Sequence, residues 1–156
     1  MTSHSIRSLV ALSAMVVAVG EPAHAKTPAG RYVVSTDGKS VLDTKTKLTW
    51  QQAAPNAGYT WAAAKSYCAD PATATLLGGA GWRLPTIKEL MTVLDYSLNS
   101  TPMFDSSVFT ANPQRIQYWS STPNDGSTAF GWYVDVWLGG TGKADPASSY
   151  GIRCVR

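Results

Sequence analysis

The chain has 156 residues, of which 44% are hydrophobic and 15% are charged, and its formal net charge is +3 at pH 7. This length is enough for one domain with its own core. The basic residues are scattered and form no run, so the composition gives no indication of nucleic-acid binding.

Residues 1–25 have the three parts of a secretory signal peptide. Arg7 provides the positive start, the apolar run 9–19 is too short to cross a membrane, and residues 23–25 form a small-x-small cleavage site. The alternative interpretation is a buried N-terminal helix. We therefore expect a secreted or periplasmic protein that does not insert into a membrane.

Cleavage leaves a short leader over residues 26–31 and one domain over residues 32–156. Both histidines of the chain, His4 and His24, lie in the signal peptide, and Glu89 is the one glutamate that remains. Without histidine, a domain cannot build a Ser-His-Asp or Cys-His nucleophile or a histidine-ligated zinc site. The composition therefore argues against an enzyme.

The domain is expected to begin with short strands. Asp37-Gly38 is a tight-turn dipeptide, and it predicts a β-hairpin made of strands 32–35 and 40–42. A third short strand is expected over residues 48–52, with Trp50 in its middle.

A first helix is expected from Trp61 to about Ala69, because Thr60 is a suitable N-cap. Trp61, Ala64 and Cys68 recur at helical spacing on one face. Cys68 should therefore point inward.

A Gly-rich loop over residues 76–81 is expected to separate this helix from a second one. Thr86 and Glu89 form a Thr-x-x-Glu capping box, and the apolar residues that follow, up to Leu94, have helical periodicity. The box indicates that Glu89 is a helix cap rather than a general acid.

The second half of the domain predicts three more strands. After a loop-like stretch over residues 97–114, strands are expected over residues 117–121 and 129–137. A Gly-rich turn over residues 139–142 then leads to a last strand over residues 150–155.

Cys68 and Cys154 are the two cysteines of the chain. In an exported protein an even number of cysteines favours a disulfide. The alternative is a pair of redox-active thiols, although no Cys-x-x-Cys motif is present.

Five blocks of aromatic and polar residues follow one another along the domain. They are Leu48-Thr49-Trp50-Gln51, Gly81-Trp82-Arg83-Leu84-Pro85-Thr86 with Glu89-Leu90, Tyr118-Trp119-Ser120-Ser121-Thr122, Trp132-Tyr133-Val134-Asp135 and Arg153-Cys154-Val155-Arg156. Their order resembles the Lcl C-terminal domain family, named after the C-terminal domain of bacterial collagen-like adhesins. The resemblance covers residues 32–156.

The resemblance implies an α+β, C-type-lectin-like fold with two helices, a small twisted antiparallel sheet and long loops. It also implies a disulfide between Cys68 and Cys154. The collagen-like stalk of well-known members is absent, as are the calcium-dependent sugar motifs of C-type lectins. The related formylglycine-generating enzymes need two active cysteines, which the expected disulfide would occupy.

Three functions are compatible with these observations. The first is a secreted adhesion module that binds anionic glycans or another cell-surface component. The second is a structural or assembly subunit of an envelope complex without a small ligand. The third is a metal-assisted enzyme that uses aspartates.

A glycan-binding patch would need basic and aromatic side chains on the surface. Arg83, Arg153 and Arg156 could form a folded basic patch, which Lys143 could extend; the alternatives are a dispersed solvated surface and, for Arg83, an internal pair with Asp135 or a carbonyl. Trp50, Trp82, Trp119 and Trp132 are expected in the core. Tyr133 and Trp137, on the opposite face of the strand from Trp132, are the candidates for stacking on a sugar.

Three aspartates are the candidates for a metal site. Asp125, Asp135 and Asp145 are expected near one another in loops or at a strand end, and carboxylates with loop carbonyls suit calcium. The alternative is that Asp135 pairs with an arginine or caps loop amides. No other cofactor is expected.

Overall fold

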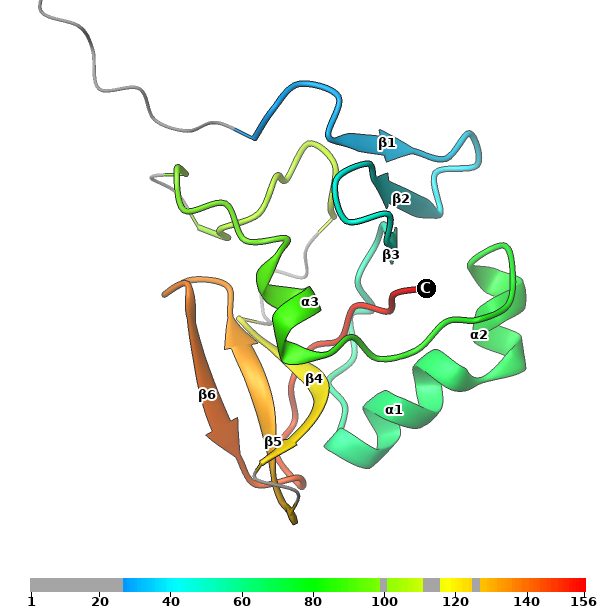
Figure 1. Cartoon of the computed structure of the whole chain (residues 1–156). Helices are drawn as coiled ribbons and strands as arrows, with labels where there is room; N and C mark the ends of the chain where they lie inside the picture. Colours follow the sequence, from blue (N-terminus) through cyan, green and yellow to red (C-terminus); the bar gives the residue numbers. More distant parts are fainter. Residues whose placement is uncertain (1–26, 99–100, 111–115, 125–126) are drawn as a thin grey trace, which may run out of the picture.

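In the computed structural model of the protein, residues 27–98, 101–110, 116–124 and 127–156 are described. Within these residues the chain forms two antiparallel three-stranded sheets and three helices (Figure 1). In chain order the elements are β1 (Tyr32–Val34), β2 (Ser40–Asp43), β3 (Thr49–Gln51), α1 (Trp61–Ala69), α2 (Pro71–Leu76), α3 (Ile87–Met91), β4 (Gln117–Asn124), β5 (Ser127–Asp135) and β6 (Gly140–Ala144). The α+β class is confirmed, but the sequence predicted one sheet and two helices.

The first sheet has the order β1-β2-β3 and contains the predicted hairpin. Its turn is held by the carboxylate of Asp37, which accepts hydrogen bonds from the Ser35 hydroxyl at 2.6 Å and the Lys39 amide at 3.1 Å. Gly38 has a φ of 69°, a backbone conformation that favours glycine. Val41 pairs with Trp50 across the sheet, and both side chains are buried.

The second sheet has the order β4-β5-β6. The expected Gly-rich turn over residues 139–142 is wrong, because β6 begins at Gly140 and the turn ends one residue earlier. Gly142 lies opposite Tyr133, and a Cβ at that position would collide with the tyrosine ring. The glycine therefore provides room for a cross-strand aromatic side chain rather than a bend.

The helices are largely those that the sequence predicts. Thr60 caps α1, and Thr86 and Glu89 form the capping box of α3. The helix α2 was not predicted: the Asp70 carboxylate accepts a hydrogen bond from the Ala72 amide, and Pro71 occupies the first turn. Asp70-Pro71 is a helix-start signal, which was overlooked because the following segment, residues 76–81, is rich in glycine.

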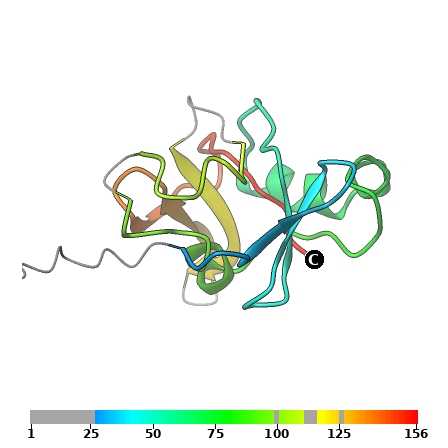
Figure 2. The same ribbon diagram turned by 90° about the horizontal axis from the view of Figure 1, so that it is seen from above.

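The last segment of the chain, residues 150–156, is extended but pairs too sparsely to form the predicted strand. Tyr150 bridges to Tyr59, Gly151 bridges to Tyr118, and Val155 bridges to Trp50 and Arg83. Residues 151–155 are all buried. Figure 2 shows this segment, in red, running between the two halves of the molecule.

Two hydrophobic clusters meet at the C-terminal segment. The first lies between α3 and the two sheets and contains Val41, Trp50, Leu90, Phe104, Phe109, Tyr118, Val134, Val136 and Val155. The second lies between α1 and β4 and contains Trp61, Ala64, Cys68, Leu77, Trp82, Leu84, Trp119, Ile152 and Cys154. Because the last segment contributes to both clusters, it ties the two sheets into one core.

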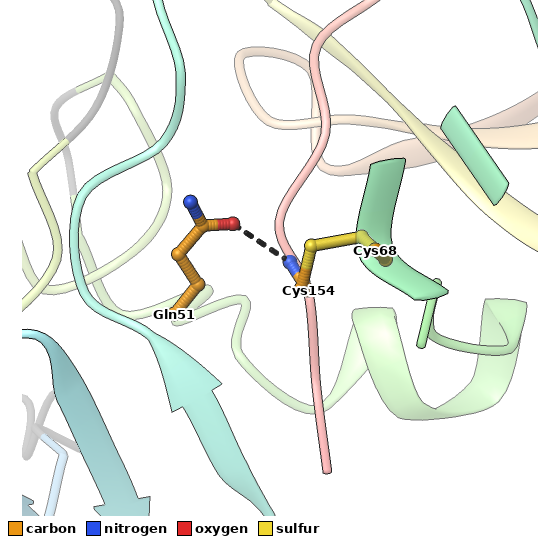
Figure 3. Close-up of a disulfide and its surroundings, with 3 residues drawn as sticks. All are labelled: Gln51, Cys68 and Cys154. Carbon is orange, nitrogen blue, oxygen red and sulfur yellow. Dashed lines mark hydrogen bonds between the residues drawn. A yellow bond between two sulfur atoms is a disulfide. The ribbon is translucent and has the colours of Figure 1, made fainter. Parts of the chain in front are cut away.

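The disulfide between Cys68 and Cys154 is confirmed. The two Cα atoms are 5.5 Å apart, and both cysteines are completely buried. The Gln51 side-chain carbonyl accepts a hydrogen bond from the Cys154 amide at 3.1 Å (Figure 3). The disulfide therefore joins α1 to the C-terminal segment, residues 150–156, beside the first sheet.

Candidate functional site

Arg153, a candidate for the basic patch, lies in the interior with 2% of its surface exposed. Its guanidinium donates hydrogen bonds to the carbonyls of Gln51 and Gln52, both at 2.6 Å, and to that of Thr110 at 3.0 Å. Burial lowers the pKa of Arg153 to about 10, so the side chain remains charged at neutral pH. The predicted surface role of Arg153 is wrong, because its donors are used inside the protein.

Arg83 is at the surface, but its charge is already paired. Its two terminal nitrogens contact the two carboxylate oxygens of Glu89 at 2.8 and 2.6 Å. The hydrogen bond from Arg83 is the main cause that lowers the pKa of Glu89 to about 2. The alternative prediction, in which the Arg83 side chain pairs with Asp135 or a carbonyl, is wrong because the partner is Glu89.

Arg156 is exposed, and its guanidinium lies 4.9 Å from the centre of the Trp82 ring. It packs closely on the backbone of Gly79 and donates a long hydrogen bond of 3.4 Å to the Gly78 carbonyl. Arg156 is thus laid flat against the Gly-rich loop. The structure does not assemble the three arginines into one exposed patch.

Asp135 and Asp145 lie at opposite ends of the β5–β6 hairpin. Asp135 pairs with Gly140, so five residues, or about 16 Å of strand, separate that position from Asp145. Asp125, the third predicted ligand, lies outside the described residues. Within the described ranges no group of three His, Cys, Asp or Glu side chains could hold a metal.

Each of these two aspartates has a structural partner instead. The Asp135 carboxylate accepts hydrogen bonds from the amides of Trp137 and Leu138, both at 2.9 Å, and from the Gln117 side chain at 3.1 Å. Asp145 accepts the Ala147 amide at 2.8 Å. A calcium site shared by Asp135 and Asp145 is therefore wrong, and the alternative, in which Asp135 caps loop amides, is confirmed.

Tyr133 and Trp137, the predicted stacking residues, do not share a face. The Tyr133 ring packs edge-on against Tyr150 with a centroid distance of 5.0 Å and is half-buried. Trp137 lies beyond the end of β5, in the turn, and 45% of its surface is exposed. They cannot act together as one platform for a sugar ring.

The structure forms an aromatic and basic surface from other residues. Trp132 and Lys143 are cross-strand partners, and the Lys143 ammonium lies 5.2 Å from the centre of the Trp132 ring. Phe130, two residues earlier in β5 and hence on the same side, is 46% exposed. We call Phe130, Trp132 and Lys143 the Trp132 face.

The prediction that all four tryptophans are core residues is therefore wrong for Trp132, which is half-buried. The cluster that includes Leu90 of α3 contains Val134 of β5 and Val136, just after the strand, but it does not include Trp132. The alternation of apolar and polar residues along β5 does not indicate where the packing of this cluster on the strand ends. The pairing of Trp132 with Lys143 would have been the useful signal, but it requires the hairpin register.

Lys143 has no acidic partner among the described residues. The ion pairs found there join Arg31 to Asp43 and Arg83 to Glu89. Asp145, two residues later and just beyond the end of β6, directs its carboxylate to the Ala147 amide. The ammonium is therefore held over a half-exposed ring, and no carboxylate of the described residues neutralises it.

One family model matches most of the chain: the Lcl C-terminal domain, over residues 39–156. The chain belongs to the Lcl C-terminal domain family. This membership suggests an adhesin-type module. No curated protein matches the chain. Within the described parts, no helix of this Lcl domain is long and apolar enough to cross a membrane.

The Trp132 face of the Lcl domain has the chemistry of a small binding surface. An indole ring offers a flat apolar platform, and an ammonium above it can bind an anionic group. Both residues lie on paired strands, so the backbone that carries them is already ordered before a ligand binds. The arrangement is suited to a ligand that has an apolar face and a negative charge.

Proposed function

We propose that this Lcl domain is a secreted, non-enzymatic binding module that recognises anionic glycans through the Trp132 face. The observation that carries the proposal is the Lys143 ammonium over the half-exposed Trp132 ring, unpaired with any acid in the described ranges. Family membership supports a role in adhesion. The C-type-lectin-like character of the fold belongs to the same proposal.

A sulfated or carboxylated sugar has the two features that such a surface requires. The C–H groups on one face of a pyranose ring can stack on an indole, and its anionic substituent can accept hydrogen bonds from an ammonium. The net charge of +3 adds a longer-range attraction for polyanions. Exposed charges are screened over about 8 to 10 Å at physiological salt, so binding should weaken as salt rises.

The lack of an enzymatic role is supported by the state of the glutamate. Glu89 has a lowered pKa because it is paired with Arg83 and caps α3, whereas a general acid needs a raised one. Residues 26–156 contain no histidine. The remaining acid–base groups thus favour a binding module.

A second function, an assembly subunit of an envelope complex, is favoured by one feature. The turn after β5 exposes 82% of Leu138 next to the exposed Trp137. The Asp135 carboxylate holds both amides, so the two apolar side chains are presented on a fixed backbone. Exposed, ordered aromatic and aliphatic side chains are typical of protein interfaces.

Retention on immobilised heparin separates the two functions. Lys143→Gln removes the ammonium from the half-exposed Trp132 ring. Lys65→Gln is the matched control, because Lys65 lies 3.8 Å from the centre of the Trp61 ring, and that ring is buried. Both variants lose one positive charge, so general attraction to a polyanion changes equally.

We expect Lys143→Gln to elute at lower salt than Lys65→Gln, which should elute close to wild type. Equal shifts in the two variants would mean that only net charge matters. Elution of the wild type below physiological salt would defeat the glycan proposal and favour the assembly subunit. A thermal melt of each variant checks that the fold is unchanged.

A further inference from the structure

A small, mostly apolar cavity is formed by residues other than those of the Trp132 face. It has a volume of about 220 Å³ and is lined by Gly38, Lys39, Ala53, Leu76 and Leu77. These residues come from the β1–β2 turn, the segment after β3 and the end of α2 (Figure 1). The cavity is therefore formed where the first sheet meets α2.

The walls of the cavity are fixed by backbone hydrogen bonds. The Gln52 amide donates to the Lys39 carbonyl at 3.0 Å, which holds the turn beside Ala53. On the other side the Leu77 amide donates to the Thr73 carbonyl at 2.9 Å and ends α2. A ligand would find these walls already in place.

The surface of the lining is almost entirely apolar, and four of the five lining residues are exposed: Gly38, Lys39, Ala53 and Leu76. Leu76 has 59% of its surface exposed, whereas Leu77 is buried. The volume is below the roughly 300 to 1,000 Å³ of sites for drug-sized ligands. The space is thus suited to one short apolar group that would cover Leu76.

The charges around the cavity favour an anion. Lys39 is the charged residue of the lining, and Arg156 is held nearby on the Gly78 carbonyl. The opposing charge is Asp37, whose carboxylate also lies close to Gly78. That carboxylate is one negative charge against the two positive charges of Lys39 and Arg156, so the cations are in excess at the rim.

We propose that this cavity binds a small amphiphilic anion: a carboxylate or sulfate on a short, unbranched apolar chain. The chain lies against Leu76, Leu77 and Ala53, and the anionic head meets the Lys39 ammonium. This site is separate from the Trp132 face and does not depend on glycan binding.

The test is an NMR titration of the ¹⁵N-labelled protein with octanoate. We expect saturable shifts at Gly38, Lys39, Ala53 and Leu77, with a Kd of about 1 mM for a ligand of this size. Hexanoate should bind more weakly, because each methylene that enters an apolar site changes the affinity by about fourfold. Acetate, which has the charge alone, and octanol, which has the chain alone, should each bind more weakly than octanoate.

Two variants and a control test the assignment. Lys39→Gln should weaken octanoate binding by about twofold to fivefold, as expected for one exposed charge. Lys45→Gln, a change at an exposed lysine in the β2–β3 turn, should leave it unchanged. Ala53→Phe should fill the cavity and abolish binding while the thermal melt stays close to that of the wild type.

Three results would overturn the proposal. One is the absence of saturable shifts at the lining residues with 10 mM octanoate, a concentration of about ten times the expected Kd. Another is equal binding of octanoate by the Lys39→Gln and Lys45→Gln variants. The third is full octanoate binding by a folded Ala53→Phe variant. Heparin retention would be unaffected by these outcomes, so the two proposals fail or stand separately.

Discussion

Arg153 and Lys143 both place a cation against aromatic rings, but they lie in opposite surroundings. The Arg153 guanidinium is 4.9 and 5.3 Å from the ring centres of Phe109 and Phe104, and three backbone carbonyls accept its hydrogen bonds. The Lys143 ammonium lies over the half-exposed Trp132 ring and faces solvent. Similar side-chain pairs thus occur in the core and at the surface.

The difference shows that cover by other segments, rather than residue type, separates a structural cation from a candidate binding one. At Arg153 the chain closes around the cation with the segment after β3 and the loop that contains Thr110. At Lys143, the cluster that includes Leu90 of α3 does not extend over β5 as far as Trp132. Three predicted effects on stability, given from the largest to the smallest, and one binding measurement test this account.

The largest effect is expected when the C-terminal segment, which carries Arg153, is no longer held by the disulfide. The disulfide closes a separation of 86 residues, and chain-entropy arguments predict that removing it lowers the free energy of unfolding by about 4 kcal/mol. The Cys68→Ala/Cys154→Ala double variant leaves no free thiol. Urea denaturation should show this loss, and a change below about 1 kcal/mol would mean that packing alone holds the segment.

Arg153→Met tests whether the buried cation is structural. The change keeps the apolar stem but removes three hydrogen bonds from a charged donor, although the Gln52 and Thr110 carbonyls keep a backbone amide each. We expect it to cost about 3 kcal/mol. Arg153→Lys, which retains the charge and some of the hydrogen bonds, should cost less. Equal stability of Arg153→Met and the wild type would show that the guanidinium is dispensable to the core.

The surface ion pair between Arg83 and Glu89 should have a smaller, pH-dependent effect. The pKa of Glu89 is lowered to about 2, so its contribution to stability is present above its ordinary pKa and is lost as the pH falls towards 2. Because 47% of the Arg83 side chain is exposed, screening should limit the effect to about 1 kcal/mol.

Glu89→Gln keeps a capping-box residue but removes the charge. Between pH 5 and pH 2 the free energy of unfolding should therefore fall less in this variant than in the wild type, by the same ~1 kcal/mol. Parallel pH profiles of the two proteins would mean that the pair contributes nothing. The comparison keeps the helix start constant and isolates the charge.

Local signals in the sequence identified much of this fold. The Asp37-Gly38 turn, the Thr60 cap and the Thr86–Glu89 capping box all depend on residues close in the chain. The expected signal peptide and the even number of cysteines were enough to suggest the disulfide. These features need no knowledge of distant contacts.

The candidate site could not be predicted in the same way. Arg153 and Arg156 are three residues apart, yet one is buried and the other exposed, because distant carbonyls surround the first. Similarly, Trp119 and Trp132 lie in neighbouring strands, but α1 and the C-terminal segment cover the ring of Trp119 alone. Which cation or ring remains uncovered is decided by tertiary packing, which periodicity does not record.

The most direct test of the account follows the indole N–H signal of Trp132 by NMR during titration with a heparin-derived tetrasaccharide. We expect this signal to shift and saturate in the wild type and in Lys65→Gln, and to shift only at several-fold higher ligand concentrations in Lys143→Gln. An unchanged Trp132 signal in the presence of bound tetrasaccharide would contradict the account. So would equal affinity in Lys143→Gln and Lys65→Gln, because the exposed cation would then have no more effect than the lysine over a buried ring.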